Sequence, residues 1–146
     1  MRIVSQKPMA MARLRGNKEN PNLKGYVRLY QYPCGVLVEA EISGLPNRPG
    51  GFFGFHIHEG GACEGETFSG TGSHYDTSCR PHPRHAGDLP PLISYGGRAY
   101  MAVMTDRFSI RDVVGRTVVV HGMPDDFRSQ PAGDAGEKIA CGVICR

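Results

Sequence analysis

The sequence predicts an all-β fold built from short strands and two long loops. Runs rich in β-branched and aromatic residues alternate with Gly, Pro, Asn and Asp along the whole chain, a pattern typical of strands separated by turns. The 20 glycines and 11 prolines among 146 residues fit a chain with many turns. No window of eleven residues places apolar side chains at helical spacing.

Seven segments have the length and composition of strands, and in chain order they are Met9–Arg15, Gly25–Gln31, Gly35–Ser43, Phe52–Glu59, Arg98–Thr105, Arg116–His121 and Lys138–Cys145. An eighth, weaker strand is expected at Pro91–Tyr95, because the preceding prolines disfavour a central place in a sheet. The sequences Pro33-Cys34-Gly35 and Gly96-Gly97 stand where hairpin turns would join strands.

The segment Gly35–Ser43 has the clearest strand pattern. The small and branched apolar residues Val36, Val38, Ala40 and Ile42 alternate with Leu37, Glu39 and Glu41. Successive side chains of a strand point to opposite faces, so this pattern predicts a sheet with one buried face.

Two stretches, Gly60–Leu92 and Gly122–Glu137, interrupt the succession of strands. Loops longer than about 15 residues are uncommon in compact domains unless something functional organises them. A metal ion or a disulfide would organise such a loop.

Length and charge limit the possible functions. The chain has the size of one domain, residues 1–146. Its 17 basic and 14 acidic residues are spread out and give a net charge of +3, so we expect no nucleic-acid partner, which would require a concentrated positive face. A mild positive charge favours a small anionic substrate.

We expect no membrane partner, because the longest apolar run, Ala99–Met104, is too short to span a bilayer. The first 15 residues lack the apolar core of a signal peptide. Two localisations stay open: a cytoplasmic protein, or the mature form of an exported one.

The six histidines fall into groups with metal-ligand spacing. His56 and His58 lie two residues apart on an expected strand, so both rings leave the same face. His121 closes another strand and offers a third ring. Four imidazoles without a thiolate suit copper.

The second group lies in the first long loop. His74, His82, His85 and Asp88 together supply three imidazoles and a carboxylate, which would complete a closed tetrahedral zinc site. Each residue alone has an ordinary structural explanation, as a solvated loop residue or a turn cap. The grouping argues for metal, because no histidine remains outside it.

These motifs together resemble the copper/zinc superoxide dismutase family, particularly bacterial members with short loops. The motifs, in the family's order, are Gly54-Phe-His-Ile-His-Glu59, Gly72-Ser-His-Tyr-Asp76, His85-Ala-Gly-Asp-Leu89, Val118-Val-Val-His121, Asp125-Asp126 and Ala140-Cys-Gly-Val-Ile144. The resemblance covers nearly the whole chain and implies an antiparallel Greek-key β-sandwich or flattened barrel of about eight strands.

The resemblance also implies the ligands of one copper and one zinc ion per subunit. Copper would be held by His56, His58, His74 and His121, and zinc by His74, His82, His85 and Asp88. His74 would bridge the two ions, since a ring that loses both protons needs two cations beside it. Asp125 would accept hydrogen bonds from one ligand of each metal.

Cys63 and Cys141 match the intrachain disulfide of the family, and two buried free thiols are the alternative. The remaining cysteines have no place in the family pattern. Cys79 is either a thiolate ligand for zinc or an ordinary loop residue. Cys34 and Cys145 would pair with each other, bridge subunits or stay reduced.

The activity implied by the resemblance is the disproportionation of superoxide to dioxygen and hydrogen peroxide. His74 would donate a proton to the forming peroxide, and Lys138 would guide the anion from the position where the family usually has arginine.

A homodimer is one of the assemblies that relatives form. The alternatives are a noncatalytic copper- and zinc-binding or chaperone-like domain and, less favoured, a zinc hydrolase, for which an open zinc position is absent.

Overall fold

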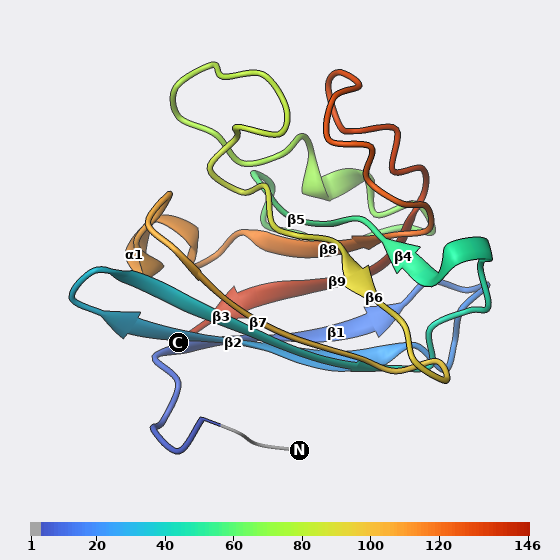
Figure 1. Cartoon of the computed structure of the whole chain (residues 1–146), viewed down its shortest axis with the longest axis horizontal. Coiled ribbons are helices and arrows are strands. Elements are labelled where there is room, and N and C mark those ends of the chain that lie inside the picture. The colour runs from blue at the N-terminus through green and yellow to red at the C-terminus, as the bar shows by residue number, and fades with distance from the viewer. Residues whose placement is uncertain (1–3) are drawn as a thin grey trace.

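The computed structural model describes residues 4–146. Seven antiparallel strands form one sheet in the order β5-β8-β9-β1-β2-β3-β7, which curls into a half-barrel (Figure 1). These strands are β1 (Ala10–Gly16), β2 (Lys24–Tyr32), β3 (Gly35–Ser43), β5 (Phe55–His58), β7 (Ala99–Thr105), β8 (Thr117–His121) and β9 (Lys138–Cys145). The all-β antiparallel fold predicted from the sequence is confirmed.

Two short strands, β4 (Phe52–Phe53) and β6 (Leu92–Ile93), form a separate ladder. β4 leads into β5 through Gly54, and β6 lies beside β7. A turn at Gly96-Gly97, where both residues have positive φ, joins β6 to β7. The small ladder therefore stands between β5 and β7, the two edges of the curled sheet.

One predicted strand, Phe52–Glu59, is split by Gly54 into β4 and β5. A Cβ atom at Gly54 would come within 2.7 Å of the Cβ of Ala135, and the Gly54 N–H donates to Met123 O at 2.9 Å. The second long loop thus touches the backbone here, which breaks the ladder. The weaker strand expected at Pro91–Tyr95 is present but shorter, as β6.

The described residues also include three short helical turns that the sequence pattern did not predict. Two are 3-10 turns, η1 (Pro49–Gly51) and η2 (Ser69–Thr71), and the third is helix α1 (Ile110–Val113). Helix α1 begins with a capping box between Ser109 and Asp112, a spacing visible in the sequence. Across residues 4–146, no helix has the length and hydropathy needed to cross a membrane.

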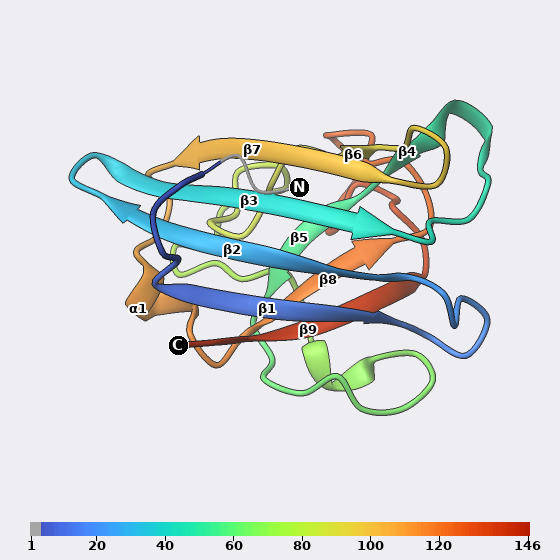
Figure 2. The same cartoon turned by 90° about the horizontal axis from the view of Figure 1, so that it is seen from below.

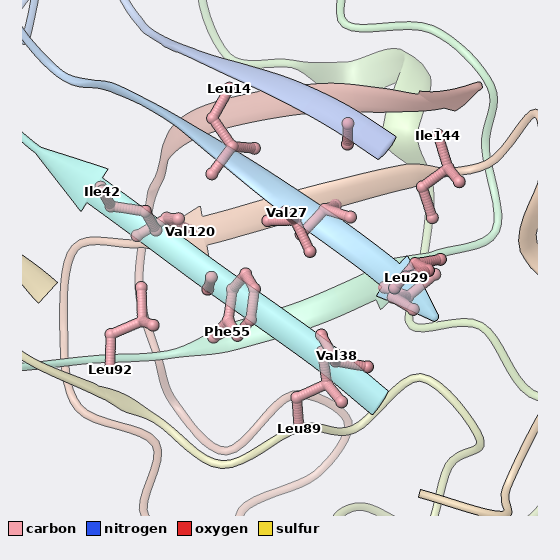
Figure 3. Packing of buried hydrophobic residues seen from close by; sticks show 14 of the residues in the cluster. Leu14, Val27, Leu29, Val38, Ile42, Phe55, Leu89, Leu92, Val120 and Ile144 are labelled. Carbon is pink, nitrogen blue, oxygen red and sulfur yellow. The ribbon is translucent and has the colours of Figure 1, made fainter. Parts of the chain in front are cut away.

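The hydrophobic core lies on the concave face of the sheet. Figure 3 shows side chains from different strands meeting there, among them Leu14, Val27, Val38, Phe55, Val120 and Ile144. On β5 the core receives Phe55 and Ile57, so the alternate residues His56 and His58 are directed to the other face, as the strand periodicity predicts.

The other face of β3 carries a buried carboxylate. Glu39 is fully buried, although it alternates with the apolar residues of its strand. Tyr100 Oη and Tyr30 Oη donate to its carboxylate at 2.7 and 3.1 Å, and Arg28 Nη1 donates at 3.3 Å. The segment before β1 also runs on this side of the sheet (Figure 2). Local polar partners therefore bury a residue that the simple pattern leaves exposed.

We expect Glu39→Ala to lower the free energy of unfolding by about 3 kcal/mol or more, because each buried donor left without an acceptor costs about 1–3 kcal/mol. Urea unfolding measures this. Glu41→Ala is the matched control. Glu41 also accepts from Arg28, but its side chain is 32% exposed whereas that of Glu39 is 0% exposed, so its loss should cost about 1 kcal/mol. Equal losses in the two variants would contradict the role of burial.

Candidate metal centre

Both long loops lie on the same side of the molecule, beyond β5 and β8 (Figure 1). β5 pairs with β8 along one edge, through Phe55↔Val120 to His58↔Thr117. Its other edge faces the first long loop, which runs beside it as a strand would. Ile57 N–H donates to Gly87 O and Tyr75 N–H donates to Ile57 O, both at 2.8 Å.

This loop pairing places loop residues opposite the strand histidines. Single antiparallel bridges join His58 to His74 and His56 to Asp88. The loop therefore brings candidate zinc ligands against candidate copper ligands, although the bridged residues are 16 and 32 positions apart in the chain.

Four buried histidines form the first cluster. One ligand atom from each of His56, His58, His74 and His121 lies within 4.8 Å of the others. His58 Nδ1 contacts Gly72 O at 2.8 Å and His121 Nδ1 contacts Gly136 O at 3.2 Å. A carbonyl accepts only, so both Nδ1 atoms carry the ring proton and both Nε2 atoms carry a lone pair.

These two lone pairs face each other, because His58 Nε2 lies 3.1 Å from His121 Nε2. A proton or a metal cation between them would remove the repulsion. Burial lowers the pKa of His58 to about 2 and that of His121 to about 3, so a proton is absent near neutral pH. The pair of rings therefore fits a metal cation.

The second cluster centres on the carboxylate of Asp88. His74 Nδ1 lies 2.8 Å from Oδ1, and the Nδ1 atoms of His82 and His85 each lie 3.1 Å from Oδ2. Burial by itself raises the pKa of Asp88, but the hydrogen bond and the charge of His74, with the charges of His82 and His85, lower it overall. Three imidazole nitrogens and one carboxylate are the donor set of a closed zinc site.

Two rings are common to both clusters. A group of His56, His74, His82 and Asp88 also has its ligand atoms within 4.8 Å, so His56 and His74 both lie between the copper-like and zinc-like sites. His85 belongs to neither group of four by this distance and reaches the second cluster through Asp88.

Asp125 links the two clusters through hydrogen bonds to one histidine of each. Its Oδ2 lies 2.7 Å from His56 Nε2 and its Oδ1 lies 2.8 Å from His82 Nε2. Gly133 makes room for this contact, because a Cβ there would lie 2.1 Å from Asp125 Oδ1 and 2.6 Å from His82 Nε2. The sequence analysis did not identify Gly133 as a site residue, and glycine alone is too weak a signal.

Buried nitrogens without hydrogen-bond partners show that the clusters fit metal ions. Among the described residues, six buried side-chain nitrogens lack such a partner: Arg48 Nε, Arg80 Nε, His56 Nδ1, His74 Nε2, His82 Nδ1 and His85 Nδ1. Unsatisfied buried polar atoms are costly and rare, and four of the six belong to candidate ligands. The two clusters have the donor sets expected for a copper and a zinc ion.

A disulfide joins Cys63 in the first long loop to Cys141 on β9, with the Cα atoms 5.8 Å apart. The pairing implied by the resemblance is confirmed. Phe68 and Val119 pack with this disulfide in a small second core. Cys34, Cys79 and Cys145 are exposed and free, so Cys34 and Cys145 do not pair with each other.

Lys138 begins β9 beside the first cluster. Its Nζ donates to Thr71 Oγ1 at 2.7 Å and to Gly72 O at 3.3 Å, and Gly72 O is also the acceptor for His58. Burial lowers the pKa of Lys138. The sequence analysis did not include Thr71, since a lone threonine in a loop carries no motif.

Comparisons with known proteins agree with this geometry. The family described as copper/zinc superoxide dismutase matches residues 23–144. A copper–zinc superoxide dismutase of Aquifex aeolicus is 35% identical over 135 residues, which cover 82% of this chain and 78% of that protein. A copper–zinc superoxide dismutase A of Xenopus laevis is 36% identical over 139 residues, which cover 84% of this chain and 89% of that protein.

The fold has a counterpart in a crystal structure of a double mutant of a SOD-like protein from Bacillus subtilis. The TM-score is 0.79, and the match covers 93% of this chain and 97% of that one at 24% sequence identity. This likeness supports the fold.

We expect the metal-free protein to lose stability as the pH falls below about 6.5. The buried rings of His58 and His121 stay neutral, with pKa values of about 2 and 3, whereas the unfolded chain takes up protons near pH 6.5. The unfolded state then binds more protons, so its free energy falls relative to the folded state by up to about 1.4 kcal/mol per pH unit for each ring.

Urea unfolding of the metal-free protein at pH 7, 6 and 5 measures this slope. The variant His58→Gln should show a smaller slope, because one titrating ring is absent. A stability that is constant or rises between pH 7 and 5 would contradict the burial of neutral rings.

Proposed function

This chain belongs to the copper/zinc superoxide dismutase family, whose members are oxidoreductases, and from that premise we propose which residues convert superoxide to dioxygen and hydrogen peroxide. The observation that carries the proposal is the set of four buried imidazole nitrogens without a hydrogen-bond partner at two adjoining clusters. When bound, copper would supply one-electron exchange with superoxide and zinc would hold the ring between the two sites.

The proposed copper ligands are His56, His58, His74 and His121, and the proposed zinc ligands are His74, His82, His85 and Asp88. His74 rather than His56 is the bridge, for a reason of proton placement. His56 Nε2 donates to Asp125 at 2.7 Å, which leaves only Nδ1 for a metal. His74 keeps Nε2 without a partner while Nδ1 faces Asp88, so its two nitrogens point to different sites.

The same arrangement suits His74 to handle a proton. Its Nδ1 lies beside Asp88 and its Nε2 has no hydrogen-bond partner, so Nε2 is the nitrogen left for the copper-side cluster. Nε2 is therefore the atom that we assign to hold a proton for the forming peroxide. The zinc-side contacts keep the ring in place meanwhile.

Lys138 is the proposed anion guide. Two of the three ammonium protons reach Thr71 and Gly72, which fixes the charge beside the copper-side cluster. The side chain also lines a surface pocket with Asn17, Lys18 and Glu137. A positive charge at this place attracts superoxide and repels competing cations.

A noncatalytic metal-binding or chaperone-like domain is the alternative function. Loss of a copper ligand would favour it, and each proposed copper ligand is present and buried. The homodimer stays a prediction, and the molecular mass in solution tests it.

The protein loaded with copper and zinc should accelerate superoxide decay, measured by stopped-flow absorbance. We expect His121→Ala to lower the rate at least about 100-fold while zinc binding persists, because His121 belongs only to the copper-side cluster. Full occupancy of both metals without superoxide decay would favour the noncatalytic alternative.

We expect Lys138→Ala to lower kcat/KM for superoxide by about three- to tenfold and to weaken its dependence on ionic strength, since a guiding charge is lost. Lys138→Arg should restore most of the rate. Lys24→Ala removes an exposed charge on β2, away from the clusters, and is the matched control. Equal effects of Lys138→Ala and Lys24→Ala would exclude a local guiding role.

A further inference from the structure

The turn His82–His85 carries two proposed zinc ligands, and side chains from other parts of the fold hold its backbone. Gln130, in the second long loop, binds His82 in both directions. The His82 N–H donates to Gln130 Oε1 at 2.8 Å, and Gln130 Nε2 donates to His82 O at 2.7 Å. This exchange of two bonds is what a neighbouring β-strand would supply, here from a single side chain 48 residues away.

Gln130 is itself tied to its own loop, since its Nε2 also donates to Arg128 O at 2.9 Å. The Gln130 side chain is exposed, but its partner His82 is only 3% exposed. Water can therefore replace Gln130 only in part.

Arg107, which follows β7, holds the rest of the turn. Its Nη1 donates to Pro83 O at 2.9 Å and to His85 O at 3.2 Å. The two carbonyls flank Arg84, so one guanidinium fixes the spacing between the two ligand-bearing residues.

The remaining backbone N–H groups of the turn are satisfied locally. Arg84 N–H donates to Pro81 O at 2.8 Å, and His85 N–H donates to Asp88 Oδ2 at 2.9 Å. The main chain around both histidines is thus held by contacts that do not involve a metal ion. Ordering a loop on binding costs free energy, and a loop that is already ordered avoids that cost.

We propose that Gln130 and Arg107 are positioning residues that hold the turn His82–His85 ready to bind zinc. The inference rests on the zinc site of the proposed function. Asp125 binds the His82 ring at Nε2, and Gln130 binds the His82 backbone, so the second long loop holds this ligand at both ends. The loop therefore sets both the direction of the ring and the position from which it extends.

Zinc affinity of the purified full-length variants tests the role of Gln130, by competition with a chromophoric chelator. Gln130→Ala should weaken zinc binding roughly five- to tenfold, the effect of losing hydrogen bonds behind a ligand. Gln31→Ala removes an amide that donates to the Tyr32 and Gly35 carbonyls and accepts from the Ile110 N–H, with no contact to the turn His82–His85, and should change the affinity by less than about twofold.

A conservative variant separates positioning from general damage to the fold. Gln130→Glu keeps the acceptor for the His82 N–H and loses the donor to His82 O, so its zinc affinity should lie between those of the unaltered protein and Gln130→Ala. The visible absorption spectrum of the Co²⁺-loaded variants should shift in the same order, because it reports ligand geometry. If Gln130→Ala does not fold, Gln130→Glu against the unaltered protein decides the question.

Arg107→Ala should also weaken zinc binding, by about three- to fivefold, whereas Arg111→Ala, an exposed arginine of α1, should not. Unchanged affinity and an unchanged Co²⁺ spectrum in the Gln130 and Arg107 variants would overturn the inference and leave the proposed function standing. Failure of the unaltered protein to bind zinc would overturn the proposed function as well.

Discussion

The carboxylate of Asp125 is the contact on which the geometry of both metal clusters depends. Burial alone would raise the pKa of Asp125, but hydrogen bonds from His56, His82 and the Phe127 N–H lower it overall, so the group stays charged and accepts. A charged acceptor keeps the ring proton of His56 and of His82 on Nε2. Both Nδ1 atoms are then left with a lone pair for a metal. One side chain thus sets the tautomer of a candidate ligand in each cluster.

The first long loop can carry ligands at fixed positions because cationic side chains from four other parts of the fold bind its carbonyl oxygens. The donors and their acceptors are Arg15 to Cys63, Arg107 to Pro83, Lys138 to Gly72 and, at the residue directly before the loop, Arg116 to Glu59. Irregular backbone cannot satisfy these groups internally as a helix or sheet does. The strands and the residues that flank them therefore supply donors, and the loop holds one conformation without regular secondary structure.

Local patterns predicted most of the strands, because a strand shows its character over five or more neighbouring residues. β3 and β9 were predicted to their end residues. The break at Gly54 was missed, since Gly54 contacts Met123 and Ala135, which are distant in sequence. Alternation alone placed Glu39 on the exposed face of its strand, whereas its burial depends on Tyr30 and Tyr100 from neighbouring strands.

The sequence by itself determined the all-β class, the candidate ligand types and the disulfide pair that the family motifs imply, because these depend on residue identity and on spacing within short segments. Only the tertiary structure decided which nitrogen of each ring is available, since that depends on acceptors such as Gly72 O, Gly136 O and Asp125 from distant segments. Likewise, only the fold brought Gln130 to His82. A hydrogen bond across 48 residues leaves no periodic trace in a sequence, because it requires two loops to meet in space.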